Sequence, residues 1–112
     1  MSRVKVLTDL LEFSKPIGML SDNLSTLDWD YEGAPLIIYS SQVKNVIERF
    51  FSGEITAKEL EEWANLIECR EDLDFEDEKR EELENVINCL ANPALEGEIS
   101  DASCKKLYFT LG

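Results

Sequence analysis

The sequence predicts an all-α fold, a compact single-domain bundle of five or six helices over residues 1–112. Three observations support this prediction. Six segments carry apolar residues at the i, i+3, i+4, i+7 spacing of a helix that buries one face. No segment shows the sustained alternation of polar and apolar residues that is typical of a half-buried strand. Capping residues and short connections separate several of the segments.

The first two predicted helices lie on either side of Pro16. The first covers roughly residues 2–13, and the second covers residues 17–27. Their apolar stripes are formed by Val4, Leu7 and Leu11, and by Ile17, Leu20, Leu24 and Leu27. Residues 28–35 contain Gly and Pro and are predicted to form a loop. The β-branched stretch 36–39 is interpreted as a connection, because no second strand is evident.

The third and fourth predicted helices have the clearest boundaries. Ser40 or Ser41 is the expected N-cap of the third, and Gly53 the residue that ends it. Thr56 and Glu59 form a capping box at the start of the fourth, in which each side chain accepts from the other residue's backbone amide. Trp63 is in phase with the apolar residues of this helix, so we expect it in the core.

The fifth predicted helix covers about residues 77–91 and ends at Asn92 and Pro93. Ser100 is the expected N-cap of a last helix. Its stripe includes Cys104, which we expect to be a buried thiol, like Cys89 on the preceding helix.

Composition excludes several functions. The chain has 24 acidic and 11 basic residues, a formal net charge of −13, and no histidine. Catalytic pairs that need an imidazole and histidine metal ligands are therefore absent, and we expect neither catalysis nor a cofactor. Sequence-independent binding to nucleic acid needs clustered Lys and Arg, which this charge balance opposes.

The sequence also shows no targeting signal, no membrane-spanning segment and no complete calcium-binding loop. No run approaches the roughly 18 apolar residues of a membrane span, and Asp9 and Glu12 interrupt any signal-peptide core, so we expect a cytoplasmic protein without membrane contact. Residues 72–78 resemble the start of a calcium loop. Asp77 and Leu83, however, stand where such a loop needs Gly and Glu, so no metal site is predicted.

The negative charge is concentrated in one part of the chain. Residues 54–101 contain 17 acidic and four basic residues, whereas residues 1–53 contain seven and five. Helix capping accounts for only some of these carboxylates. A solvated face would explain the rest, and so would a docking surface for a basic protein. The candidate docking carboxylates are Glu61, Glu62, Glu68, Asp72, Asp74, Glu76 and Asp77.

Trp29 and Tyr31 are two further candidates for partner binding. They lie in an acidic loop outside any helical stripe, so an aromatic anchor at an interface is one interpretation and a lid over the bundle is the other.

The stretch 50–72 contains a helix end, the turn Ser52-Gly53-Glu54-Ile55-Thr56 and a capped helix that carries Trp63. In this pattern the chain resembles the immunity proteins of contact-dependent growth-inhibition and colicin-type bacterial toxins. The resemblance implies a cytoplasmic protein that binds one cognate toxin domain, often a nuclease, and blocks its active site or substrate contact. No interface residues are carried over from the family.

Three functions are therefore compared. The expected function is that of an immunity protein whose acidic helical surface neutralises a basic toxin domain, with a nuclease as the expected toxin. An adaptor or secretion chaperone that holds an apolar partner segment is the main alternative. A DNA mimic would need carboxylates spaced like backbone phosphates.

Overall fold

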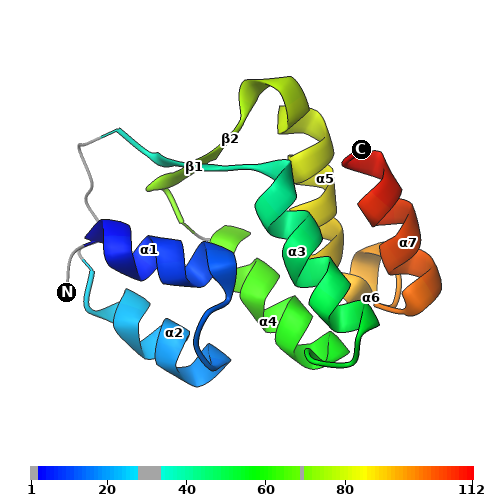
Figure 1. Cartoon of the computed structure of the whole chain (residues 1–112), viewed down its shortest axis with the longest axis horizontal. Helices are drawn as coiled ribbons and strands as arrows, with labels where there is room; N and C mark the ends of the chain where they lie inside the picture. The colour runs from blue at the N-terminus through cyan, green and yellow to red at the C-terminus, as the bar shows by residue number, and fades with distance from the viewer. Residues whose placement is uncertain (1–2, 28–33, 69) are drawn as a thin grey trace.

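The computed structural model describes residues 3–27, 34–68 and 70–112. Its elements follow one another along the chain as shown in Figure 1. They are α1 (Arg3–Glu12), α2 (Ile17–Ser25), β1 (Leu36–Ile38), α3 (Ser40–Phe51), α4 (Ala57–Glu68), β2 (Leu73–Phe75), the 3-10 turn η1 (Asp77–Lys79), α5 (Arg80–Ala91), α6 (Pro93–Glu96) and α7 (Asp101–Thr110). The all-α prediction is confirmed, and each of the six predicted helices is present.

Helix α4 occupies the middle of the fold. Figure 1 shows α1 and α2 on one side of it and α5, α6 and α7 on the other. The most extensive packing between two elements is that of α4 against α5. Both helices bury an amphipathic stripe, as their spacing requires. The buried residues of the pair are Leu60, Trp63, Ala64 and Ile67 on α4, and Leu83, Val86, Ile87, Leu90 and Ala91 on α5.

Trp63 of α4 contacts α1 through a hydrogen bond and packs against the residue that follows α1. Its side chain is fully buried, and its indole Nε1 donates a hydrogen bond of 2.6 Å to the carbonyl oxygen of Leu10. The ring also stacks on Phe13, with 6.4 Å between ring centroids. A buried tryptophan needs a partner for its N–H, and the end of α1 supplies it. The prediction that Trp63 belongs to the core is confirmed.

The interpretation of residues 36–39 as a plain connection was wrong for Leu36–Ile38. Strand β1 pairs in parallel with β2, with Leu36 opposite Leu73 and Ile38 opposite Phe75. A parallel pair needs a long crossover, which α3 and α4 provide here. Each strand has only three residues, and its partner lies more than 30 residues away in sequence, so local periodicity could not reveal the pair.

The helix ends confirm most of the predicted caps. Thr56 and Glu59 exchange the two hydrogen bonds of a capping box, at 3.0 and 3.1 Å. Gly53 follows α3 with a φ of +84°, a left-handed conformation that favours glycine. The N-cap of α3, however, is Tyr39, whose amide donates to the side chain of Gln42 at 2.9 Å. The prediction of Ser40 or Ser41 was therefore wrong by one or two residues.

The last part of the chain adds one unpredicted helix. Ser100 caps α7 as expected, since its Oγ accepts from the Ser103 amide at 3.2 Å. The four-residue helix α6 begins at Pro93, directly after α5 ends. Pro is favoured in the first turn of a helix, so the residue that stops α5 also starts α6.

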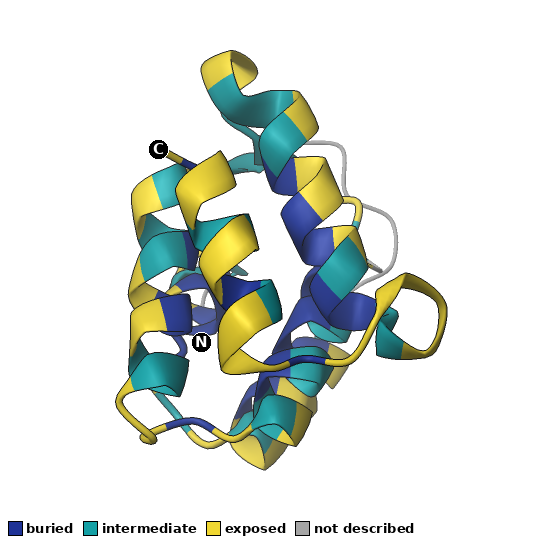
Figure 2. Ribbon diagram, turned by 90° about the vertical axis from the view of Figure 1, so that its right-hand side faces the viewer, coloured by how far each residue is buried: buried dark blue, intermediate teal, exposed yellow. Residues whose placement is uncertain are grey.

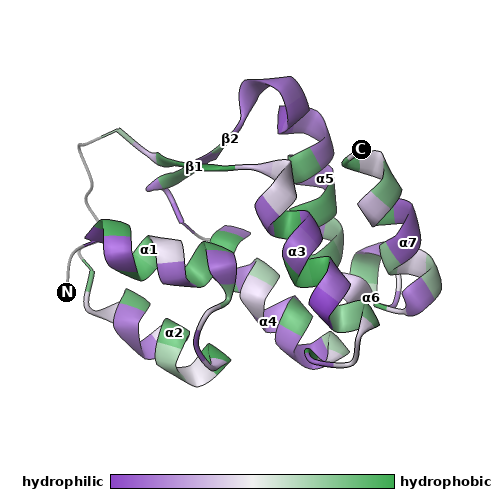
Figure 3. Ribbon diagram, in the orientation of Figure 1, coloured by the Kyte–Doolittle hydropathy of each residue, from purple (hydrophilic) through white to green (hydrophobic). Residues whose placement is uncertain are grey.

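Burial follows the amphipathic patterns for most of the predicted stripe residues, but Val4 of the first stripe is 60% exposed, so its assignment to the buried face was wrong. The helices turn their exposed faces outward and their buried faces toward a shared core (Figure 2). Cys104 is buried, as expected, whereas Cys89 is only half-buried. Burial raises the pKa of the Cys104 thiol to about 11. Hydrophilic residues cover η1 and the start of α5, and apolar residues line the inner sides of the helices (Figure 3).

Candidate protein-binding surface around α4

The predicted docking carboxylates fall into two groups, and Asp72 represents the first. Its side chain is only 2% exposed. Arg70 donates to both carboxylate oxygens, at 2.9 and 2.6 Å, and Arg3 donates to one of them. Burial alone would raise the pKa of Asp72, but the hydrogen bonds from Arg70 and Arg3 outweigh it and hold the pKa below its ordinary value.

Asp72 therefore connects parts of the fold. Its carboxylate links the start of α1 to the segment before β2, and its carbonyl oxygen accepts from the Leu36 amide at 3.0 Å, next to the β1–β2 pair. A carboxylate enclosed in this way is not accessible to a partner protein. The surface defined below leaves Asp72 out.

Asp74 and Asp77 share one internal cation. The guanidinium of Arg80 donates to Asp74 Oδ2 at 3.2 Å and to Asp77 Oδ1 at 3.0 Å. The hydrogen bonds from Arg80 also lower the pKa of Asp74. Both carboxylates lie at the surface, but their charge is partly compensated within the fold. Glu76 is half-buried and lies beside them, with the Ser40 hydroxyl 3.4 Å from its carboxylate.

The second group consists of carboxylates on α4. Glu61 and Glu62 are half-buried and Glu68 is exposed. None of the three has an ion-pair partner within 4 Å among the described residues. Glu61 and Glu68 are separated by two helical turns, so they lie on the same face of α4. Unlike Asp72, these carboxylates form no ion pair with a cation of the described chain.

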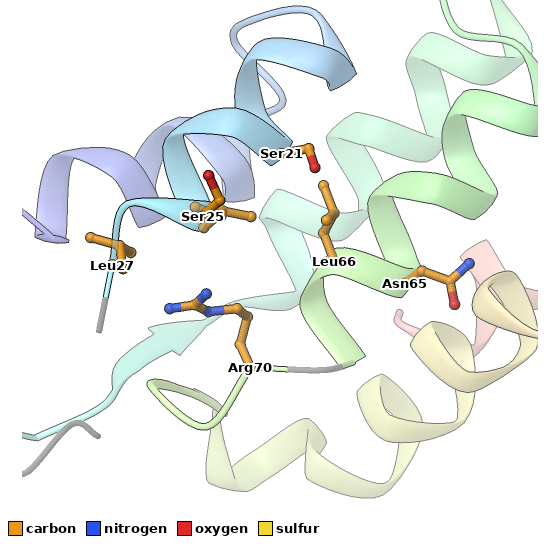
Figure 4. Close-up of a pocket in the computed structure, with 7 residues that line it drawn as sticks. Ser21, Ser25, Leu27, Asn65, Leu66 and Arg70 are labelled. Carbon is orange, nitrogen blue, oxygen red and sulfur yellow. The ribbon is translucent and has the colours of Figure 1, made fainter. Parts of the chain in front are cut away.

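Two hollows between α2 and α4 form one continuous depression, which we call the α2–α4 groove. The larger hollow has a volume of about 440 Å³, and its walls come from both helices (Figure 4). Its lining residues are Ser21, Leu24, Ser25, Leu27, Asn65, Leu66 and Arg70. The second hollow, of about 390 Å³, shares Ser21, Asn65 and Leu66 with the first and reaches Glu62. The groove is thus mainly apolar and has a carboxylate at one end.

The opposite side of α4 has two more hollows. One, of about 400 Å³, is lined by Lys58, Glu61 and Glu62 together with Pro93, Glu98 and Ile99. The other, of about 290 Å³, lies between α4, the β1–β2 pair and α5, and we call it the α4–α5 groove. Glu68 and Glu84 both line it.

The four hollows are connected through shared residues. Glu62 lines hollows on both sides of α4, and so does Arg70. We define the α4 surface as the exposed part of α4 with these hollows. Its characteristic residues are Glu61, Glu62, Asn65, Leu66, Glu68 and Glu84. A ridge of carboxylates that form no ion pair with the described chain, flanked by partly apolar hollows, can bind a protein whose surface is basic and partly apolar.

Sequence reasoning missed three of these residues. Leu66 is out of phase with the buried stripe of α4, and this was the signal that could have identified it as an apolar surface residue. Asn65 and Glu84 carry no such signal, because only the packing of α2 and α5 beside α4 places them at the hollows.

The two aromatic candidates, Trp29 and Tyr31, lie in residues 28–33, outside the described residues. Within the described ranges, no group of three His, Cys, Asp or Glu side chains is arranged to hold a metal ion. Nor does this part of the chain contain a helix with the length and apolar character needed to cross a membrane.

Comparisons with known proteins add no relative. The chain matches no family model, no curated protein and no solved structure.

Proposed function

We propose that this protein is a cytoplasmic, non-enzymatic immunity protein that neutralises a basic bacterial toxin domain, a nuclease in the simplest case. The α4 surface is the proposed docking site. The observation that supports the proposal most directly is the set of carboxylates on α4, Glu61, Glu62 and Glu68, that have no ion-pair partner in the described part of the chain.

Electrostatics explains why a nuclease suits this surface. An enzyme that holds nucleic acid presents Lys and Arg to the phosphate backbone. A helix with uncompensated carboxylates can occupy the same surface and exclude the substrate. The field of a chain with a net charge of −13 also accelerates encounter with a basic partner, by about 10- to 1,000-fold at low salt.

The first test is capture of a partner from the native host. The captured complex is washed at low and at high salt, and the bound protein is identified. A single basic toxin domain that dissociates as salt rises is the expected result. The purified domain is then mixed with the protein, and its nuclease activity is measured. A captured domain whose activity is unaffected would contradict the proposal.

The second test locates the docking site with a matched pair of variants. Glu61→Gln with Glu62→Gln removes two charges from the α4 surface. Glu12→Gln with Asp22→Asn removes two charges from exposed positions on α1 and α2. We expect the first variant to slow association with the toxin domain by about tenfold, and the control to change it by less than about twofold. Equal effects would show that only net charge matters, which would refute the assignment to α4.

The α2–α4 groove favours one alternative, an adaptor or secretion chaperone that binds an apolar partner segment. Its lining includes Leu24, Leu27 and Leu66. This alternative predicts a complex that resists high salt and is weakened by Leu66→Ser. The immunity proposal predicts a complex that high salt dissociates.

A further inference from the structure

The α4–α5 groove combines an apolar floor with carboxylates in its lining. The side chains of Ile67, Leu73, Phe75 and Ile87 form part of the lining, and Glu68 and Glu84 come from the two helices that border it. Its volume is about 290 Å³. A side chain that enters it would need a long apolar stem and a cationic head.

One of the two carboxylates accepts a hydrogen bond from the C-terminal end of α5. The Nδ2 of Asn92 donates to Glu68 Oε2 at 3.3 Å. The same group contacts Asn88 at its carbonyl oxygen and at Oδ1, at 2.9 and 3.0 Å. The longest of the three contacts therefore brings the Glu68 carboxylate toward the end of α5.

Among the residues that the structure describes, the only cationic side chain that lines the groove is already engaged in an ion pair. Arg70 directs its guanidinium to the buried carboxylate of Asp72 through two hydrogen bonds. Glu68 and Glu84 have no such internal partner in the described chain. The two carboxylates that line the groove are therefore available to bind a cation from a partner protein.

We propose that the α4–α5 groove receives an arginine side chain of the basic partner protein. This inference rests on the proposed function and specifies which partner group that function uses. The methylene stem of arginine covers the apolar floor, and its planar guanidinium carries five N–H donors, enough for carboxylates on both helices. A lysine ammonium is a compact point charge that is more strongly hydrated, so it gains less from the groove.

The test uses N-acetyl-arginine methylamide as the probe, with backbone amide NMR shifts of the intact protein as the readout. We expect saturable shifts that centre on Glu68, Glu84, Ile87 and Asn88, with a dissociation constant on the order of millimolar for so small a ligand. The citrulline analogue has nearly the same shape and no charge, and it should give no saturable shifts. The lysine analogue should bind more weakly than the arginine probe.

Matched variants make the test specific to the groove. Glu68→Gln with Glu84→Gln should weaken binding of the arginine probe by at least about tenfold. Glu12→Gln with Asp22→Asn removes the same charge from exposed positions outside the α4 surface and should change binding of the arginine probe by less than about twofold. The amide spectrum of each variant shows whether it is folded. Shifts spread over the whole acidic surface, or equal effects of the two variants, would overturn the proposal.

Two outcomes separate this inference from the proposed function. If the toxin domain binds and Glu61 and Glu62 matter, but the arginine probe does not bind, the groove assignment fails and the function stands. If the probe binds the groove while no toxin domain is neutralised, the function fails and the arginine site stands. Equal binding of the lysine and arginine analogues would refute the preference for arginine.

Discussion

Replacing Asp72 with asparagine tests whether this residue stabilises the fold or binds a partner. Asn has nearly the same shape as Asp but lacks its negative charge. The change leaves the guanidiniums of Arg70 and Arg3 without their shared anion. These side chains are only 15% and 19% exposed, and Asp72 is 2% exposed, so water replaces the lost partner poorly.

The burial of this ion pair sets the expected loss of folding free energy. Removing one partner of a buried ion pair costs about 3–5 kcal/mol. Because both arginine side chains retain some access to solvent, we expect the lower end, about 3 kcal/mol for Asp72→Asn. In a domain of this size, that corresponds to a fall of roughly 10–15 °C in the melting temperature.

The pH dependence provides a second signature. The folded pKa of Asp72 lies below its ordinary value, so the stabilisation is present above the unfolded pKa of about 3.9 and is lost as pH falls through the folded pKa. The difference between wild type and Asp72→Asn should therefore be full at pH 7 and should narrow below about pH 4.

Urea and thermal unfolding of both proteins measure these values. Asp77→Asn is the matched control, because its side chain is 95% exposed and its ion pair with Arg80 lies at the surface. The control should be much less destabilising than Asp72→Asn. If Asp72→Asn proved as stable as wild type but bound the toxin domain less tightly, Asp72 would be an interface residue and the reasoning from burial would be wrong.

Three further predictions concern the fold. Trp63→Phe should lower the free energy of unfolding by about 2 kcal/mol in urea titrations, because it removes the hydrogen bond to Leu10 and leaves unfilled volume in the core. Gly53→Ala should cost about 1 kcal/mol; a Cβ would meet nothing within 4 Å, so a larger loss would refute the view that only the φ of +84° opposes it. Iodoacetamide labelling of the folded protein at pH 8, followed by peptide mapping, should modify half-buried Cys89 and leave Cys104, with its pKa of about 11, unmodified.

Local sequence patterns carried most of the information about the helices. The stripe of α4 and the exchange of hydrogen bonds between Thr56 and Glu59 depend on residues three or four positions apart, so the sequence displays them directly. The same holds for Gly53, because glycine has no Cβ and can adopt the left-handed conformation that ends α3. The all-α class follows from such short-range features.

The β1–β2 pair and the cap of α3 show where local patterns fail. Leu36 and Leu73 are opposite each other only because α3 and α4 return the chain to the same place. Tyr39 caps α3 although Ser40 is the better intrinsic N-cap residue, since β1 ends at Ile38 and sets where the helix can begin. Both features depend on contacts between distant parts of the chain.

The candidate surface divides in the same way. Composition and charge indicated an acidic region between residues 54 and 101, and the position of Glu61, Glu62 and Glu68 on one helix followed from their spacing. Which carboxylates remain uncompensated was decided by tertiary packing, because Asp72 meets Arg3 only when residues 69 positions apart come together. A charge in the sequence becomes part of a binding surface only if folding leaves it exposed and without an internal partner, and that condition depends on long-range contacts.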